Sequence, residues 1–170
     1  MKVFSVVLLG LFVNLCSAHR YERCELAREL AGHGFPRHEL PDWICLVESE
    51  SNFDTRSINK HNSDGSWDWG LFQINDRYWC RGHYPESKNV CGIDCEEMLD
   101  SGLDFQINCI KTIFKVHGFD AWVAWRDKCK GKKLPSLDHC FNTSAYCFTL
   151  EYDNIPEMFM IGNGLDLKFK

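Results

Sequence analysis

Two carboxylates in one stretch of the chain, residues 43–80, are placed to do acid–base chemistry together. Glu50 lies at the end of an expected helix, and Asp68 lies on an expected hairpin, so the two come from different elements. Aromatic and amide side chains are frequent around both positions. A pair of carboxyl groups, one protonated and the other ionised, can cleave a glycosidic bond. The stretch therefore favours a sugar-binding cleft with one carboxylate on each wall.

Local sequence patterns predict the two elements that must position these carboxylates. Pro41 begins a helix in which Ile44, Val47 and Ser51 fall on one face at helical spacing. Residues 62–65 form a turn cluster that ends in Asp-Gly, which favours a tight hairpin. Residues 67–74 are rich in aromatic and β-branched side chains and are expected to form strands.

The rest of the chain supplies further helices around this region. We expect a first helix that ends at Gly32 and Gly34, strands and turns over residues 57–84, and a helical turn before a third long helix. A fourth helix is expected to begin at Asp120 as its cap. The helix ranges are 20–31, 96–99, 103–117 and 119–128. Helices at both ends with strands between them predict an α+β domain of two lobes and a cleft.

The first 18 residues have the pattern of a secretory signal peptide. Lys2 supplies the positive end, residues 3–13 are almost wholly apolar, and Cys16-Ser17-Ala18 offers small residues for cleavage. A membrane anchor would need about 20 apolar residues, and Asn14 interrupts the run too early. We therefore expect a signal peptide at 1–18, a secreted, extracellular domain at 19–140 and an extension at 141–170.

Cysteine content agrees with secretion. The chain has ten cysteines, and Cys16 would leave with the signal peptide, so an odd number remains. In an oxidising compartment this predicts disulfides plus one unpaired thiol. Eight cysteines allow roughly a hundred pairings, among which spacing cannot choose. A zinc site is the alternative, but no Cys-x₂-Cys pair occurs.

The charge of the chain bears on its partners. The formal net charge is −5 at pH 7, which argues against a nucleic acid as partner. No segment after residue 18 is apolar enough to span a membrane. The histidines are scattered, and nothing in the sequence indicates a metal or another cofactor. An acidic protein approaches anionic surfaces poorly, so we expect it to work at mildly acidic pH.

Several motifs in one order resemble those of the c-type (animal) lysozymes. They are the sequences CELA at 24–27, ESNF at 50–53, DGSWDWGLFQIN at 64–75, RYWC at 77–80 and DAWVAWRDKC at 120–129. The resemblance covers about residues 19–140 and implies the lysozyme fold, a mainly helical lobe and a small β-hairpin lobe with the cleft between them. It also implies four disulfides, which leave Cys147 unpaired: Cys24–Cys140, Cys45–Cys129, Cys80–Cys95 and Cys91–Cys109.

The resemblance assigns roles to the two carboxylates. It implies that Glu50 is the general acid, that Trp122 forms an apolar wall that raises the pKa of Glu50, and that Asp68 is the ionised partner. Asn62, Ser66 and Asn75 are expected to hydrogen-bond Asp68. The residues that we expect to bind sugar are Asn62, Ser66, Gln73, Asn75, Tyr78, Trp79 and Trp122. Without the surrounding motifs, a glutamate or aspartate at either position would more often be a solvated surface charge. We assign that surface role to Glu48. We assign Trp125 to the core.

The implied function is that of a secreted, retaining glycoside hydrolase. Its substrate would be the β-1,4 bond between N-acetylmuramic acid and N-acetylglucosamine in bacterial peptidoglycan. The competing class is a non-catalytic carbohydrate-binding or regulatory protein on the same fold. A third interpretation is that the protein acts by interaction through the extension at 141–170, and that its enzyme domain is incidental to that function.

Some positions depart from the family pattern. Some relatives bind calcium through an aspartate-rich loop, but the corresponding loop here keeps only Asp100 and Asp104, so no calcium site is expected. The segment between Cys109 and Ala121, which contains His117, is one residue shorter than in typical family members. Relatives often offer a polar group there to the far end of the sugar chain, so the shortening affects the outer end of the cleft. The large side chains of Trp67 and Trp69 flank Asp68 and are bulkier than usual.

The extension contributes a predicted N-glycosylation site at Asn142, within Asn-Thr-Ser. We expect a monomer, with Cys147 as the candidate for a disulfide between two chains.

Overall fold

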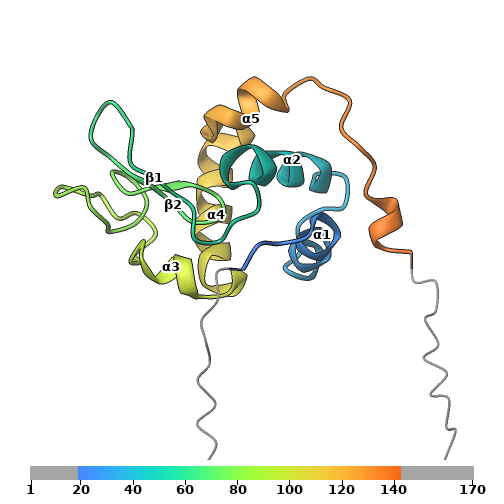
Figure 1. The fold of residues 1–170 in the computed structure, drawn as a ribbon, viewed down its shortest axis with the longest axis horizontal. Coiled ribbons are helices and arrows are strands. Elements are labelled where there is room, and N and C mark those ends of the chain that lie inside the picture. The colour runs from blue at the N-terminus through green and yellow to red at the C-terminus, as the bar shows by residue number, and fades with distance from the viewer. Residues whose placement is uncertain (1–18, 143–170) are drawn as a thin grey trace, which may run out of the picture.

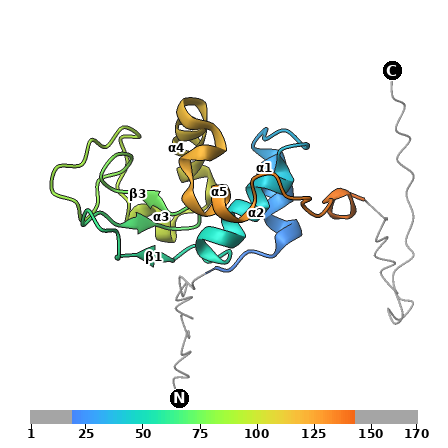
Figure 2. The same cartoon turned by 90° about the horizontal axis from the view of Figure 1, so that it is seen from above.

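The computed structural model describes residues 19–142 and has seven helical segments and three short strands within them. The strands and α3 form one lobe, and the other helices form the second lobe (Figures 1 and 2). This arrangement confirms the predicted α+β class and the lysozyme fold. The elements are α1 (Arg23–Gly32), α2 (Leu40–Ser51), β1 (Ile58–Asn59), β2 (Asp68–Trp69), β3 (Ile74–Asn75), α3 (Glu97–Asp100), α4 (Leu103–His117), the 3₁₀ helix η1 (Gly118–Ala121), α5 (Val123–Lys128) and the 3₁₀ helix η2 (Asp138–Cys140).

The sheet sorts its residues into a polar row and an apolar row. It is antiparallel in the order β1-β2-β3, and Asp68 lies opposite Asn59 on one side and Asn75 on the other. The second row is apolar, with Trp69 between Ile58 and Ile74. Residues paired across strands project to the same face, so the register gathers two amides around one carboxylate.

Trp43 of α2 is the centre of the helical core. Its side chain is fully buried, and the rings that pack around it at centroid distances of 4.8–6.1 Å come from four other parts of the domain. These rings belong to Phe35, Phe72, Phe114, Phe119 and Trp122. Such aromatic packing fixes α2 against α4 and η1.

The end of α2 fixes the position of Glu50. Pro41 lies in the first turn, where its missing N–H costs no helical bond. Asn52 follows the last residue with a left-handed backbone (φ 51°), and Phe53 is also left-handed (φ 65°). Asparagine tolerates this conformation and ends helices for that reason. Glu50 therefore lies in the last turn, directly before the chain turns toward the sheet.

Four disulfides hold these elements and confirm the predicted pairing. They join Cys24 to Cys140, Cys45 to Cys129, Cys80 to Cys95 and Cys91 to Cys109. The bond between Cys45 and Cys129 ties α2 to the end of α5, and the bond between Cys24 and Cys140 ties α1 to η2. Bridges that close long loops typically contribute about 2–4 kcal/mol each. The signal peptide and Cys147 lie outside the described residues.

Three predicted boundaries were wrong. The helix expected over 119–128 is interrupted at Trp122, whose backbone is extended because its indole is buried against Trp43 and donates to the Phe72 carbonyl. The strands expected over 67–74 are present but short, β2 and β3 of two residues each, and a turn in which Gly70 has φ 72° joins them. The first helix begins at Arg23 rather than residue 20, since Arg20 forms a bridge with Asp54.

Candidate active site in the cleft between the lobes

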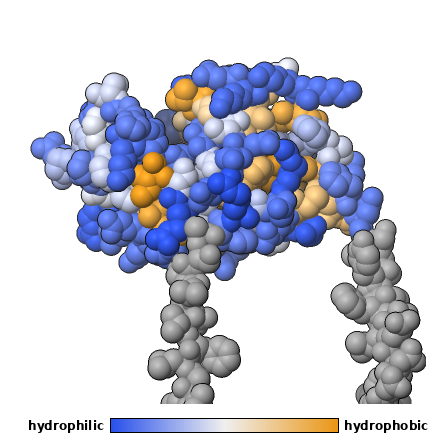
Figure 3. All heavy atoms as spheres, in the orientation of Figure 1, coloured by the Kyte–Doolittle hydropathy of each residue, from blue (hydrophilic) through white to orange (hydrophobic). Residues whose placement is uncertain are grey.

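A cleft of about 1180 Å³ runs between the two lobes, and Figure 3 shows the surface hollowed there. Its walls come from the end of α2, the sheet, the end of α4, η1 and the start of α5. All of the residues predicted to be catalytic or sugar-binding line it: Glu50, Asn62, Ser66, Asp68, Gln73, Asn75, Tyr78, Trp79 and Trp122. The fold thus brings together side chains from separate elements, as expected.

Glu50 lies half-buried on the helical wall. Its Oε1 accepts a hydrogen bond from the Ala124 N–H at 3.2 Å. Burial raises the pKa of Glu50 from 4.5 to about 7, and the charge of Asp68 adds to this, whereas the Ala124 bond and Lys128 lower it. The direction of the pKa shift is the predicted one. Glu50 can therefore hold a proton near neutral pH and release it to a bound group.

Asp68 lies on the opposite wall among amide donors. Its Oδ2 accepts hydrogen bonds from Asn59 Nδ2 at 3.1 Å and Asn62 Nδ2 at 2.9 Å. Its Oδ1 accepts one from Asn75 Nδ2 at 2.7 Å. An ionised carboxylate can accept all three, and such bonds stabilise its charge. Glu50 and Asp68 have the same functional group but different surroundings: Glu50 is largely removed from water and accepts one hydrogen bond, whereas Asp68 accepts three from amides.

A second set of polar groups orients these amides. Ser66 is 1% exposed, and its hydroxyl accepts from Asn75 at 2.8 Å and from Asn62 at 3.3 Å. The same hydroxyl donates to Asp64 Oδ1 at 2.6 Å. Hydrogen bonds from Ser66, helped by Arg77, lower the pKa of Asp64 to about 2. Ser66 therefore acts on Asp68 through the amides, instead of bonding it directly as predicted.

Gln73 serves the turn between β2 and β3. It is 9% exposed, and its Nε2 donates to the carbonyls of Ser57 at 3.0 Å and Gly70 at 2.8 Å. Its backbone is left-handed, with φ 48°. The amide nitrogen thus donates to the backbone, and the role of Gln73 in binding sugar stays a prediction.

Aromatic and apolar side chains form the rest of the walls. Trp122 is buried, Trp79 is half-buried with its ring edge-on to His117 at 5.9 Å, and Tyr78 is 40% exposed. Tyr78 and the exposed Val90 and Val123 all line the cleft. Exposed apolar groups gathered in one place are typical of a binding site. These surfaces can stack on the apolar faces of sugar rings.

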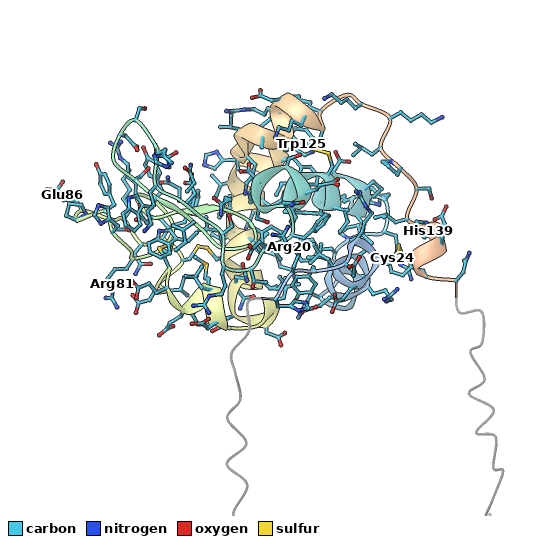
Figure 4. The ribbon with its side chains drawn as sticks, viewed as in Figure 1. Arg20, Cys24, Arg81, Glu86, Trp125 and His139 are labelled. Carbon is cyan, nitrogen blue, oxygen red and sulfur yellow. A yellow bond between two sulfur atoms is a disulfide. The ribbon has the colours of Figure 1, made fainter. Side chains whose placement is uncertain are left out.

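Other predicted residues lie away from the cleft. Trp125 packs against Phe119 and donates its Nε1–H to Asp42 at 2.9 Å (Figure 4 labels Trp125), in accordance with its assignment to the core. Glu48 is exposed and pairs with Arg23 at 2.6 Å, as a surface residue.

The bulky tryptophans beside Asp68 also turn away from the cleft. Trp69 is buried and donates its Nε1–H to Asp76 at 3.2 Å, and Trp67 stacks on His83 at 4.1 Å. Asp76 is fully buried and also accepts the N–H groups of Trp67 and Tyr84. This buried carboxylate, which joins β2 to the following loop, was missed by the sequence analysis.

Sequence reasoning also missed Asn59 and Asp64, which complete the hydrogen bonds around Asp68. The hairpin turn predicted at residues 62–65 is the signal from which the role of Asn59 could have been predicted. Pairing the two strands across that turn places Asn59 opposite Asp68.

The acidic residues of the loop considered for calcium, and one further cluster in the described residues, have other partners. Asp100 faces Arg56 at 3.4 Å, whereas Asp104 faces His33 at 3.3 Å, so the two acidic groups of the loop have different partners. In residues 19–142 one cluster has metal-ligand spacing, Cys24 with His139 and Cys140 (Figure 4). Its sulfurs form a disulfide, and a thiolate is the form that binds metals. The absence of a calcium site stays a prediction.

Comparisons with known proteins agree with the geometry. A family model described as the C-type lysozyme/alpha-lactalbumin family matches residues 19–140. Lysozyme c-1 of Anopheles gambiae is 47% identical over 144 residues, which is 83% of this chain and 100% of that protein. Lysozyme C II of Oncorhynchus mykiss is 46% identical over 135 residues, 76% of this chain and 93% of that protein. The crystal structure of lysozyme from Equus asinus superposes with a TM-score of 0.66 at 38% identity, covering 72% of this chain and 98% of that chain.

Proposed function

Because the chain belongs to the C-type lysozyme/alpha-lactalbumin family, we propose that it is a secreted lysozyme. Its substrate is the β-1,4 bond between N-acetylmuramic acid and N-acetylglucosamine in bacterial peptidoglycan. One observation carries the proposal: Glu50, with its pKa raised to about 7, faces the same cleft as Asp68 and its three amide donors.

The two carboxylates have complementary tasks. Glu50 protonates the oxygen of the glycosidic bond, so that the leaving sugar departs as an alcohol. Asp68 meets the positive charge that develops on the remaining sugar, as nucleophile or as electrostatic stabiliser. Glu50, now ionised, then takes a proton from water, which completes hydrolysis with retention of configuration.

The walls of the cleft hold the sugar chain in place for this reaction. Tyr78 and Trp79 offer ring faces, and Trp122 closes the apolar wall near Glu50. Asn62 and Asn75 are shared between Asp68 and the substrate. Binding energy from several sugar rings can then orient one bond between the carboxylates.

The family also includes proteins that are not enzymes, so a carbohydrate-binding protein on this fold is the second candidate. A protein that only binds sugar needs neither the raised pKa of Glu50 nor the amides around Asp68. The presence of both therefore supports the hydrolase.

The release of reducing ends from purified peptidoglycan tests this proposal. We expect wild-type protein to release them, with products of retained configuration by NMR, and Asp68→Asn to be slower by at least about a hundredfold. An Asp138→Asn variant, at an exposed position in η2, serves as the control for a change of carboxylate to amide. Wild-type protein that binds sugar oligomers but releases nothing would leave only the binding function.

A further inference from the structure

Asp64 is linked to Asp68 through other side chains. Its Oδ1 accepts both the backbone N–H and the hydroxyl of Ser66, at 3.0 and 2.6 Å. Its Oδ2 accepts a hydrogen bond from the Arg77 guanidinium at 2.9 Å, so the carboxylate is held on both sides. Ser66 is 1% exposed, and water therefore does not compete for its hydroxyl proton. Asp64 thus fixes the direction in which that proton points.

The direction of this proton decides what Ser66 offers to two of the amides around Asp68. A hydroxyl has one proton to donate and two lone pairs with which it accepts. Since the proton goes to Asp64, the oxygen can accept from Asn75 Nδ2 at 2.8 Å and from Asn62 Nδ2 at 3.3 Å. Both amide nitrogens also donate to Asp68, at 2.7 and 2.9 Å. Each of these NH₂ groups therefore uses one proton on the hydroxyl and the other on the carboxylate.

The oxygen ends of the same amides are held in the matching sense. Asn75 Oδ1 accepts the backbone N–H of Arg77 at 3.1 Å, and Asn62 Oδ1 accepts from Asn59 Nδ2 at 3.1 Å. Both NH₂ groups thus face Asp68. An amide that turned around would present an oxygen to this carboxylate in place of a donor, which would repel its charge.

We propose that Asp64 is a positioning residue for the reaction, which draws the Ser66 hydroxyl proton away from the amides and so keeps their donors on Asp68. The inference rests on the proposed function, because it assigns a further residue to that reaction. Without Asp64, the buried hydroxyl would either donate to an amide oxygen or leave its proton unpaired, and an unpaired buried donor is unfavourable. In both cases the amides would hold Asp68 less firmly.

Steady-state kinetics of the full secreted protein on purified peptidoglycan test this role. We expect Asp64→Ala to lower kcat about tenfold while KM stays within about twofold of wild type. Asp64→Asn keeps an oxygen that can accept from Ser66 but removes the charge, and we expect it to recover kcat to within about threefold of wild type. Equal losses of kcat in the two variants would overturn the proposal, because the charge of Asp64 would then matter instead of its acceptor.

Asp54→Ala is the matched control. Asp54 has the same local arrangement, since its Oδ1 accepts the Arg56 N–H at 2.9 Å and its Oδ2 accepts from Arg20 at 3.4 Å, but it does not line the cleft. We expect kcat and KM within about twofold of wild type. A kcat as low as that of Asp64→Ala would show that loss of any such turn slows the enzyme, and would contradict a specific role for Asp64.

A double-mutant cycle separates action through Ser66 from a direct contact with sugar. Asp64 lines the cleft, so contact with the substrate is the alternative. If Asp64 acts through Ser66, the kcat of Asp64→Ala/Ser66→Ala equals that of Ser66→Ala within about twofold, because the hydroxyl that Asp64 orients is already absent. Losses that multiply in the double variant, or a raised KM with unchanged kcat, would refute the proposal.

NMR without substrate distinguishes this inference from the proposed function. We expect the side-chain NH₂ groups of Asn62 and Asn75 to exchange their protons with water at least about fivefold faster in Asp64→Ala than in wild type, and at the wild-type rate in Asp54→Ala. Unchanged exchange in Asp64→Ala would overturn the inference. Faster exchange in a protein whose wild type cleaves no peptidoglycan would contradict the proposed hydrolase and leave the orienting role of Asp64 supported.

Discussion

Glu50 and Asp68 show how two identical functional groups acquire different chemistry from their surroundings. Burial raises the pKa of Glu50 to about 7, while the amides of Asn59, Asn62 and Asn75 donate to Asp68. The sequence alone indicated both carboxylates and two of the three amides. It missed Asn59 because that amide becomes a neighbour only through the strand register.

Removing the charge of Glu50 is expected to stabilise the fold at neutral and alkaline pH. A carboxyl whose pKa is higher in the folded state than in the unfolded state lowers stability as it ionises. The effect is absent below about pH 4.5, grows as pH rises to about 7 and is constant above that. We predict that Glu50→Gln is more stable than wild type by about 1–3 kcal/mol at pH 8 and equal at pH 4. Denaturant titrations at the two pH values check this, and an equal difference at both would contradict it.

Asn59 is expected to matter for the rate although it carries no reacting atom. Asn59→Ala removes one donor to the charge of Asp68, and hydrogen bonds to charged groups contribute about 1.5–3 kcal/mol. We predict a fall in kcat of about ten- to a hundredfold with little change in KM. Asn108→Ala, at an exposed position of α4, is the matched control. Steady-state kinetics would contradict the prediction if both variants kept the rate of wild type.

At the scale of elements, the sheet is positioned by a buried carboxylate in place of long strands. Each strand has two residues, and Asp76 accepts the N–H groups of Trp67, Trp69 and Tyr84 just after β3. The chain comes so close here that a Cβ on Gly82 would lie 2.9 Å from the Asp76 carboxylate. Asp76 thus ties the lobe that carries Asp68 to the loop behind it.

Loss of this carboxylate should destabilise the sheet. Asp76→Ala leaves three donors without their acceptor, and we predict a loss of about 2–4 kcal/mol in the free energy of unfolding. Asp94→Ala removes the partly exposed ion-pair partner of Arg81 and should change stability little. Thermal unfolding of both variants tests the predicted difference in stability. Similar melting temperatures for the two variants would show that Asp76 does not stabilise the sheet.

Helix positions were predictable from apolar spacing, but the interruptions were not. The period of α4 is clear in the sequence, and its helix begins and ends at the predicted residues. The break at Trp122 depends on a hydrogen bond from its indole to the carbonyl of Phe72, a residue that is distant in the sequence. The turn after Gly70 likewise depends on the hydrogen bond from Gln73 to the Ser57 carbonyl, which only the fold brings near.

At the scale of the whole molecule, the features that position the candidate site lie in the part of the chain that the structure describes. All four disulfides, the cleft and the core lie between residues 19 and 142. In this range no helix is long and apolar enough to cross a membrane. The pairing of the cysteines came from the family resemblance, because spacing alone left it open. The signal peptide, glycosylation at the exposed Asn142 and the state of Cys147 stay predictions.

Removal of residues 143–170 should therefore leave the enzyme folded and active. We predict that the shortened protein clears bacterial walls at a rate within about twofold of the full chain and has a similar melting temperature, because the four disulfides and the cleft residues described above lie within residues 19–142 and are kept. Non-reducing gels of the full chain show in the same experiment whether Cys147 links two molecules. Loss of activity without loss of folding would favour the interpretation in which the extension is the active part.

The most direct test of the central claim is the lysis of bacterial cell walls from pH 4 to pH 8 by wild type and by Glu50→Gln. We predict that wild type clears the walls and that its activity falls as pH rises through about 7, where Glu50 loses its proton. Glu50→Gln should be inactive at every pH while it still binds sugar oligomers. A Glu50→Gln variant that retained the activity and pH dependence of wild type would contradict the assignment of Glu50 as the acid.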